Sequence, residues 1–585
     1  MSDTYPPGPA GPVEPGAQPP VPPAYAPAYG QPAYPQPSTG APEYLEAGGG
    51  SPLPPDTPVA AAGGGGRRRG LMIGGGVAAL AVVGVGAWAA AQFFATGAQP
   101  AEALPASTIG YASIDLDPSG GQKIEALRTL NKFPAFKDEI GLDANDDVRQ
   151  KIFEELDFPE DCKIFYAEDI EPWLGDRFAV AAVDTGQDAP EIVGVIQVKD
   201  EKEADAGLTK LRDCGNGGTS ESSGGWVIND GWAIVAEDQE GAQAVADATA
   251  KGTLADDADF KDITARAGSA GIVSMYAAPA AGQYLADSMG GVGGLAGELE
   301  QGLTGGDMLG GGEELQPQDG SNPMADALKN FKGMAVSVRF SDGALEIESA
   351  GDTGLLPKSL YGTDRGADVV ETLPTATAAA IGVGFEPGWL TDVVDQFSAF
   401  GGGMTTDELF QEASDATGLD VPADIETLLG ESAALSFGSD FDPEAFFNSG
   451  DASDLPITLK VKGDEAAARK VLDKILAQDP EAGKYFALDS DAGYFAIGPD
   501  EDHRTAVLGR GDLGNNEVYR DVIRESDKAS ALLYVNFDVG DDWLVRLAGD
   551  DQSVKENLQP LAGFGITAWQ DDDWTHSVMR LTTDK

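Results

Sequence analysis

The first feature in the hydrophobic pattern of the chain is one uninterrupted apolar run. Residues 71–94 contain no charged side chain. A helix rises about 1.5 Å per residue, so a run of this length can cross the roughly 30 Å hydrocarbon core of a bilayer. The pattern therefore predicts a transmembrane helix.

The charges beside this run predict its direction in the membrane. Arg67, Arg68 and Arg69 stand directly before it, and the first basic residue after it is Lys123. Basic residues concentrate on the cytoplasmic side of a membrane span. A cleaved signal peptide is the competing interpretation, but 66 residues precede the arginines, whereas the basic start of a signal peptide is short. We expect a signal anchor in residues 67–96, with the N-terminus in the cytoplasm and the C-terminal part extracytoplasmic.

Beyond the anchor, apolar positions recur with the periods of strands and helices. Residues 178–183 and 192–198 resemble short strands, and residues 226–235 resemble a hairpin with an Asn-Asp-Gly turn. Residues 203–211 and 240–250 have the period of amphipathic helices. This mixture predicts an α+β fold with mainly antiparallel sheets.

The same order of elements occurs twice. Residues 169–175 recur as residues 424–430 with five of seven positions identical. Gln197–Lys199 matches Lys460–Lys462, and each precedes a predicted helix. We therefore expect two tandem duplicated modules, residues 102–352 and 371–585. Three further matches keep the same order: Leu104-Pro105 with Leu373-Pro374, residues 260–263 with 519–522, and residues 333–338 with 563–568.

The first module carries a glycine-rich insertion at residues 289–322. Its composition predicts a flexible loop rather than a regular element. A lid over a binding cleft and an idle insertion are both compatible with it.

Residues 1–66 are rich in Pro, Gly and Ala, with tyrosines between them. Such a segment cannot bury enough apolar surface to order itself, so we expect a disordered cytoplasmic tail. Its Pro-rich stretches can offer polyproline ligands to partner proteins, or they can serve as a spacer.

Charge is distributed unevenly along the chain. Of its 97 acidic and 38 basic residues, five acidic and three basic ones lie in residues 1–70, which leaves a net charge of −57 for the rest. A field of this sign repels phosphates and excludes nucleic-acid binding. Because acidic residues occur in every segment, we interpret them mainly as a solvated surface.

The chain has two cysteines, Cys162 and Cys214, and both lie in the first module. In an extracytoplasmic domain such a pair commonly oxidises, so we predict a disulfide, with two free thiols or a metal pair as the alternatives. Closing about 50 residues stabilises a fold by roughly 4 kcal/mol in the chain-entropy model.

No combination of residues meets the requirements of a known catalytic or metal site, and we assign no catalytic, cofactor-binding or metal-binding residue. The two histidines, His503 and His576, are far apart in sequence, and we expect both on the surface. Residues 143–154 imitate a calcium-binding loop, but Val148 replaces the glycine that makes its turn, so residues 146–156 favour a helix. Trp173, which matches Leu428, is expected in the core.

Three segments carry a resemblance to a known family: residues 111–121, 172–177 and 275–282. With them, the chain from about Arg67 to its end resembles an uncharacterised family of actinobacterial membrane proteins, known as domain of unknown function number 3352. The resemblance implies a streptomycete-like source, an envelope location and cysteines at positions 162 and 214. It implies no activity and no catalytic residue.

These observations favour a membrane-anchored, non-enzymatic protein of the cell envelope, whose duplicated acidic ectodomain binds an apolar or cell-wall ligand between its modules. One alternative is an envelope glycan hydrolase that uses a carboxylate pair, since the sequence alone does not locate such a pair. Another is a transmembrane scaffold that recruits cytoplasmic partners through the Pro-rich tail.

Overall fold

A computed structural model describes residues 98–584, and these belong to one compact unit. The predicted tail, the anchor with its three arginines, and residues 292–322 of the glycine-rich insertion lie outside the described residues. Among the helices in the described part of the chain, none is both long and apolar enough to cross a membrane. The ranges within 98–584 that are left out are 117–119, 140–146, 155–161, 188, 216–223, 270, 292–327, 353–358, 360–361, 402–403, 441–454, 548–550 and 572.

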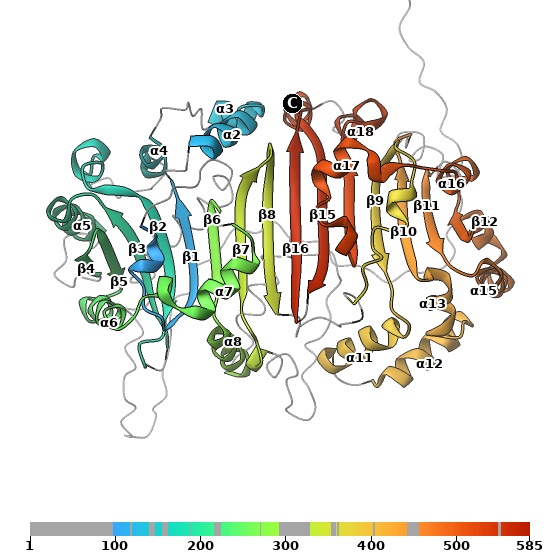
Figure 1. Ribbon diagram of the computed structural model, residues 1–585, viewed down its shortest axis with the longest axis horizontal. Helices are drawn as coiled ribbons and strands as arrows, with labels where there is room; N and C mark the ends of the chain where they lie inside the picture. Colours follow the sequence, from blue (N-terminus) through green and yellow to red (C-terminus); the bar gives the residue numbers. More distant parts are fainter. Residues whose placement is uncertain are drawn as a thin grey trace, which may run out of the picture. The chain divides into compact units, whose positions relative to one another are not determined.

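Sixteen strands of the described residues form one antiparallel sheet, which confirms the predicted α+β class (Figure 1). The first eight strands are β1 (Thr108–Asp115), β2 (Leu174–Val183), β3 (Glu191–Val198), β4 (Gly225–Asn229), β5 (Trp232–Ala236), β6 (Val273–Ala277), β7 (Met334–Ser341) and β8 (Ala344–Asp352). The last eight are β9 (Thr377–Gly384), β10 (Ser432–Gly438), β11 (Ile457–Lys462), β12 (Ala487–Asp491), β13 (Tyr494–Gly498), β14 (Ala531–Asn536), β15 (Leu561–Asp571) and β16 (Trp574–Thr583).

The helices follow the strands in two similar series. Those of the first half, the part that contains β1–β8, are α2 (Gly120–Leu130), α3 (Pro134–Glu139), α4 (Val148–Glu154), α5 (Glu201–Gly215), α6 (Gln239–Thr249), α7 (Ala258–Arg266) and α8 (Pro279–Gly291). Those of the second half, which contains β9–β16, are α11 (Trp389–Gly401), α12 (Thr406–Thr417), α13 (Ala423–Leu429), α15 (Glu465–Gln478), α16 (Glu501–Leu508), α17 (Glu517–Val522), α18 (Val539–Leu547) and α19 (Gln552–Leu558).

Strand order is the same in both halves. Outward from the centre of the sheet, the first half runs β8-β7-β6-β1-β2-β3-β5-β4, and the second runs β16-β15-β14-β9-β10-β11-β13-β12. The halves meet where β8 pairs with β16, in a register from Ala344 opposite Thr582 to Asp352 opposite Trp574. We call this pairing the seam. From here on, an edge of the sheet means one of the two borders at which its strands end. Because the seam is antiparallel, the corresponding ends of equivalent strands in the two halves lie at opposite edges.

The predicted elements of the first half are present, with slightly different ends. The strands predicted at residues 178–183 and 192–198 are β2 and β3, and the helices predicted at residues 203–211 and 240–250 are α5 and α6. The predicted hairpin is β4–β5, and its turn residues Asp230 and Gly231 have φ angles of 50° and 81°. Glycine adopts this left-handed region without steric cost, which explains its place in the turn.

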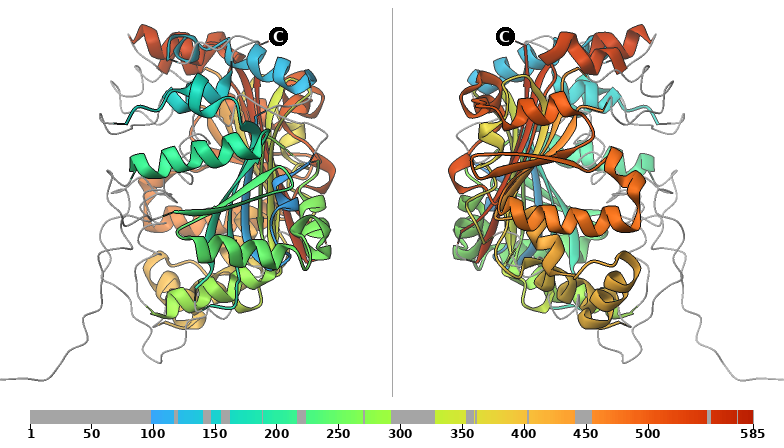
Figure 2. Two further views of the ribbon diagram at one scale, coloured as in Figure 1. Left: turned by 90° about the vertical axis from the view of Figure 1, so that its left-hand side faces the viewer. Right: turned by 90° about the vertical axis from the view of Figure 1, so that its right-hand side faces the viewer.

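Helices lie on both faces of the sheet (Figure 2). On the first face, strand residues such as Val195 and Ile234 pack with Val245 of α6 and Ile263 of α7. The second half buries α16 and α17 on the same face. On the second face, Ile196 packs with Leu208 of α5, and Phe495 packs with Leu472 of α15. Neighbouring residues of one strand thus enter different cores.

Residues that match in sequence make the same contacts in both halves. The Lys210 ammonium lies 2.6 Å from Asp169, and that of Lys474 lies 2.6 Å from Asp424. The amides of Leu254 and Leu513 donate to the carbonyls of Leu104 (2.7 Å) and Leu373 (3.1 Å), and all four of these leucines are fully buried.

One exchange between the halves preserves core volume. Trp173 is buried, as predicted, and its indole N–H donates to the carbonyl of Asp169 at 2.6 Å. A side chain at Gly207 of α5 would stand 2.2 Å from that indole nitrogen. In the second half, Leu428 stands in place of the tryptophan and Val471 in place of the glycine. The smaller residue on one element is thus accompanied by the larger one on the other.

Candidate functional site

The most extensive candidate feature is a row of apolar side chains across the second face of the sheet. Strand pairing places one apolar residue beside the next over seven neighbouring strands, including the two strands of the seam. Branched and long aliphatic residues suit a face that packs against apolar matter. We call the set the apolar row: Ile347, Met579, Ile566, Leu533, Ile381, Leu435 and Leu459.

The apolar row is incompletely covered. At its ends it continues into residues that are buried, Val338 beside Ala126 of α2 and Ile497 beside Leu472 of α15. Between these ends the row is half-buried, and Ile381 is 43% exposed although it lies on a central strand. A contiguous apolar surface that remains accessible on a folded protein commonly binds a partner or a ligand.

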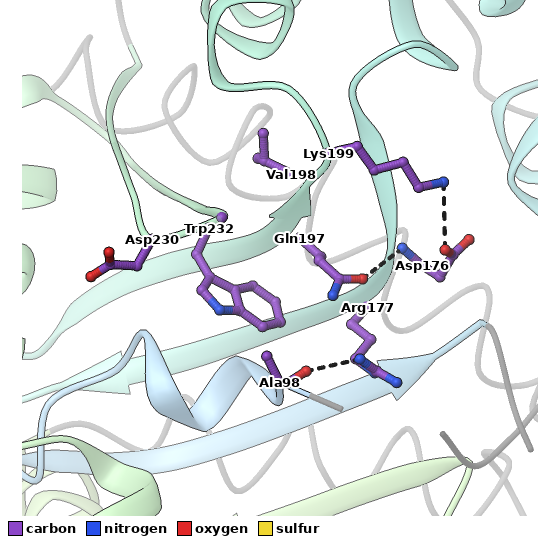
Figure 3. A pocket seen from close by; sticks show the side chains of 9 residues that line it. Ala98, Asp176, Arg177, Gln197, Val198, Lys199, Asp230 and Trp232 are labelled. Carbon is purple, nitrogen blue, oxygen red and sulfur yellow. Dashed lines mark hydrogen bonds and ion pairs between the residues drawn. The ribbon is translucent and has the colours of Figure 1, made fainter. Parts of the chain in front are cut away.

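A smaller cavity of about 280 Å³ lies at one edge of the first half (Figure 3). The Arg177 guanidinium at its wall donates to the Asp115 carboxylate at 2.8 Å and to the carbonyl of Ala98 at 2.9 Å. Lys199 lies 3.5 Å from Asp176, whose amide donates to Gln197. We call this cavity the Arg177 pocket. The β4–β5 turn, through Asp230 and Gly231, completes its lining together with Val198 and Trp232.

The second half has a cavity of about 370 Å³ at the equivalent place, which we call the Lys462 pocket. Lys462 pairs with Asp368 at 3.1 Å, and this hydrogen bond raises the pKa of the lysine. The pocket is formed by the start of β10, the end of β11 and the β12–β13 turn. Because the seam is antiparallel, the two pockets open at opposite edges of the sheet. The other lining residues of the Lys462 pocket are Thr427, Gly430, Glu431, Gly463, Asp464 and Gly493.

Each pocket contains acidic and basic side chains that already pair with each other or with neighbours. Charges compensated in this way offer a small polar ligand few unsatisfied groups. Among the lining residues of the two pockets, Thr427 carries a hydroxyl, and it donates to the carbonyl of Ala423.

A buried ionic cluster lies on the first face at the seam. Arg580 of β16 is 1% exposed and pairs with Glu346 of β8. Arg339 of β7 contacts the same Glu346 at 2.5 Å and also Glu348. Two carboxylates are therefore close together, but both are paired with arginine. In glycoside hydrolysis the two carboxyl groups flank the scissile bond, whereas arginine side chains engage both of these carboxylates.

The expectation that both histidines are on the surface is wrong. His576 is buried and stacks on Trp569, with 5.2 Å between the ring centroids. His503 is half-buried, and its Nε2 lies 3.5 Å from the hydroxyl of Ser436. Burial lowers the pKa of both rings. The sequence signal for His576 was its place two residues from both Trp574 and Val578, which puts the three side chains on one face of a strand.

Sequence reasoning also missed Lys460, which matches Gln197 of the first half. Its ammonium donates to the hydroxyl (2.9 Å) and the carbonyl (3.2 Å) of Thr372, and it lies 5.1 Å from the ring centroid of Tyr494. Desolvation lowers the pKa of Lys460 to about 8. On its strand Lys460 faces away from Leu459 and Val461, a pattern typical of a solvent-facing lysine, and it is buried because both faces of the sheet are covered here.

In the segment that imitates a calcium-binding loop, the structure describes one acidic residue before the helix, Asp147. Residues 143–146 lie outside the described residues, but both oxygens of Asp147 accept hydrogen bonds from Arg149, and one also accepts from Tyr166. The arginine and these hydrogen bonds lower the pKa of Asp147, against the effect of its burial. The predicted helix follows as α4. In the part of the chain that the structure describes, no three His, Cys, Asp or Glu residues are placed to hold a metal ion.

Cys162 and Cys214 form the predicted disulfide, with their Cα atoms 5.5 Å apart. The bond connects the end of α5 to the segment before Tyr166. It therefore reinforces the second-face core of the first half, which contains Trp173 and Leu208.

Together these features define an α+β protein with one large antiparallel sheet and no assigned catalytic centre. Residues 71–268 match the family described as "Protein of unknown function (DUF3352)". The match confirms the resemblance to this family over the predicted anchor and the first half as far as α7, and the family description names no activity, source or membrane location. No curated protein and no solved structure matches the chain.

Proposed function

We propose that this chain is a membrane-anchored, non-enzymatic protein of the cell envelope that binds an elongated apolar ligand along the apolar row. The observation that carries the proposal is the half-buried state of this row across the seam, with Ile381 43% exposed on a central strand. Burial of each exposed aliphatic side chain by a ligand would be favourable by about 25 cal/mol per Å².

The dimensions of the row favour a long, thin ligand. Seven strands spaced about 4.8 Å apart give a row of roughly 30 Å. An aliphatic chain matches such a row, whereas a compact polar molecule would leave most of it uncovered. We expect the polar end of the ligand to lie beyond the row, where charged helices border the sheet.

Three features support the envelope location. The uncharged run at residues 71–94 follows three arginines, the ectodomain carries a net charge of −57, and the cysteines are joined in a disulfide. Disulfides persist in oxidising compartments outside the cytoplasm. A family match that begins at residue 71 includes the predicted anchor.

We further propose that the two halves arose by duplication. The identical strand order, the lysine–aspartate pairs and the matched leucine contacts support this interpretation. The apolar row crosses the seam, so an ancestral single half would have presented only part of it.

Photo-crosslinking in the full chain tests ligand binding. A photoreactive p-benzoylphenylalanine replaces Ile381, and in a control it replaces Met404, which is similarly exposed (41%) but lies between α11 and α12 and on no strand of the row. After irradiation of cells, mass spectrometry should detect adducts with long aliphatic chains on the 381 variant only. Equal adducts on both variants, or none on the 381 variant, would contradict the proposal.

A further inference from the structure

We propose that the edge of the sheet at the Arg177 pocket lies against the bilayer surface, and that the edge with α11–α13 points away from it. This inference rests on the anchor in the proposed function. It goes further by assigning the surface of the ectodomain that faces the membrane.

The chain is fixed to the fold immediately after the anchor. The carbonyl of Ala98 accepts a hydrogen bond from the buried Arg177 guanidinium. Pro100 and Ala101 are buried in a short 3₁₀ turn, and Leu104 is completely inaccessible to solvent. The ectodomain is therefore held at Ala98 itself, rather than at the end of a long linker.

The distance from the anchor to this point is short. Four residue steps separate Phe94, the last residue of the uncharged run, from Ala98. An extended chain covers at most about 3.5 Å per residue, so these steps span no more than about 14 Å. Ala98 and the Arg177 pocket must then lie close to the lipid headgroups.

The fold places one group of helices at this edge. β1 ends at Asp115, which lies opposite Arg177 of β2, and α2–α4 connect these two strand ends. In the second half, α11–α13 connect β9 to β10 in the same way, at the opposite edge. Figure 1 shows α2, α3 and α4 along the upper edge and α11, α12 and α13 in the lower part.

Charge distinguishes these equivalent groups of helices. Residues 120–154, which span α2–α4, contain six basic and seven acidic residues. Residues 389–429, which include α11–α13, contain nine acidic residues and no basic one. An anionic bilayer surface repels the second group and tolerates the first, so charge favours the same orientation as the short connection.

Exposed apolar side chains beside basic ones also occur at the proposed membrane edge. Ile124 of α2 is 55% exposed on the helix that carries Arg128, and Phe165, two residues after Lys163, is 58% exposed. Apolar side chains with neighbouring basic residues suit the interface between headgroups and acyl chains. Met404 shows that exposed apolar residues also occur at the other edge, so they support the orientation only together with the charge.

The two halves provide a matched pair of label positions. Asn229 ends β4 beside the Arg177 pocket, and Asp491 ends β12 beside the Lys462 pocket, and both are exposed. The two native cysteines are joined to each other, so N229C and D491C each add one free thiol for a fluorophore. The full-length labelled variants are reconstituted into vesicles of phosphatidylglycerol and phosphatidylcholine that contain a headgroup-located nitroxide quencher.

We expect severalfold stronger quenching of the label at position 229 than at position 491. Inserting a twelve-residue Gly-Ser linker between Gly97 and Ala98 should greatly reduce this difference. Equal quenching at both positions in vesicle-bound protein would overturn the orientation and leave the anchor intact. Protein that is released from the vesicles by alkaline carbonate would overturn the anchor itself, and the orientation with it.

Discussion

Glu346 of β8 and Arg580 of β16 lie opposite each other in the seam and form a buried ion pair. The first residue belongs to the first half and the second is close to the C-terminus. The pair thus joins side chains of the two halves, in addition to the backbone hydrogen bonds of the seam. Arg339 shares the same carboxylate, so two buried guanidinium groups depend on Glu346.

Replacing Glu346 by alanine should destabilise the whole sheet. The variant leaves two buried arginines with Glu348 as their nearby carboxylate, and loss of one partner of a buried pair costs about 3–5 kcal/mol. Urea unfolding followed by circular dichroism measures the free energy of unfolding. D342A is the control, because Asp342 pairs with Arg524 in an exposed position, where ion pairs contribute less than about 1 kcal/mol. Equal losses in both variants would show that the seam cluster has no special role.

Lys460 should make stability depend on pH. Its pKa is about 8 in the fold and near 10.5 in the unfolded chain, so between these values the folded state binds fewer protons. The free energy of unfolding therefore rises as the pH rises through this range, and the penalty is constant below about pH 8. Between pH 7 and 9.5 the gain from this residue is about 2 kcal/mol.

The control for Lys460 is K460Q, which introduces the residue that the first half has at Gln197. This variant removes the titration while it keeps a hydrogen-bond donor for Thr372. Urea unfolding of both proteins at pH 7 and pH 9.5 should show a larger gain for the natural chain. If the two proteins gain equally, the lysine titrates normally in the fold.

Trp173 and Gly207 should be energetically coupled. G207A should cost about 1–3 kcal/mol, because the new methyl group meets the indole nitrogen. W173L leaves a cavity and should cost about 2–4 kcal/mol. The double variant W173L/G207V reproduces the Leu428 and Val471 combination, and it should lose clearly less than the sum for W173L and G207V alone. Combined with V471A in the other half, W173L should instead give an additive loss.

Removing the disulfide should weaken the first half. The cysteines are 52 residues apart, and the double variant C162S/C214S should lose about 4 kcal/mol in the chain-entropy model. Hydrogen exchange should increase most in α5, with the equivalent α15 as an internal reference. Dithiothreitol should produce the same change in the natural chain and none in the double variant, and a response of the variant to the reductant would contradict this assignment.

Local pattern was sufficient to predict β2, β3, the β4–β5 hairpin, α5 and α6, because alternation along β2 and the period of α5 follow directly from which side chains are buried. The Asn-Asp-Gly turn was predictable for the same local reason. The sequence match between Asp169 and Asp424 predicted that they occupy equivalent positions. In the structure each of them pairs with a lysine of the helix that follows.

The seam and the apolar row were not predictable in this way. Pairing of Glu346 with Arg580 joins residues far apart in the chain, and no local period specifies which strand edges meet. Ile381 and Leu533 have the sequence pattern of ordinary core residues, and only the position of the covering helices leaves them half-buried. The expectation for His576 was wrong because it rested on the small number of histidines and their distance in the sequence. It did not use the strand face that His576 shares with Val578.

The pairing of β8 with β16 has a consequence for biosynthesis. β16 follows β8 in the sequence by more than two hundred residues, so β8 leaves the ribosome long before its partner exists. During that interval a nine-residue strand has one unpaired edge, which is the kind of surface that recruits other chains into aggregates. A truncation after the first half, or a pause in translation there, would prolong this exposed state. Synthesis of β16 therefore covers the edge of β8 that is left unpaired in the nascent chain.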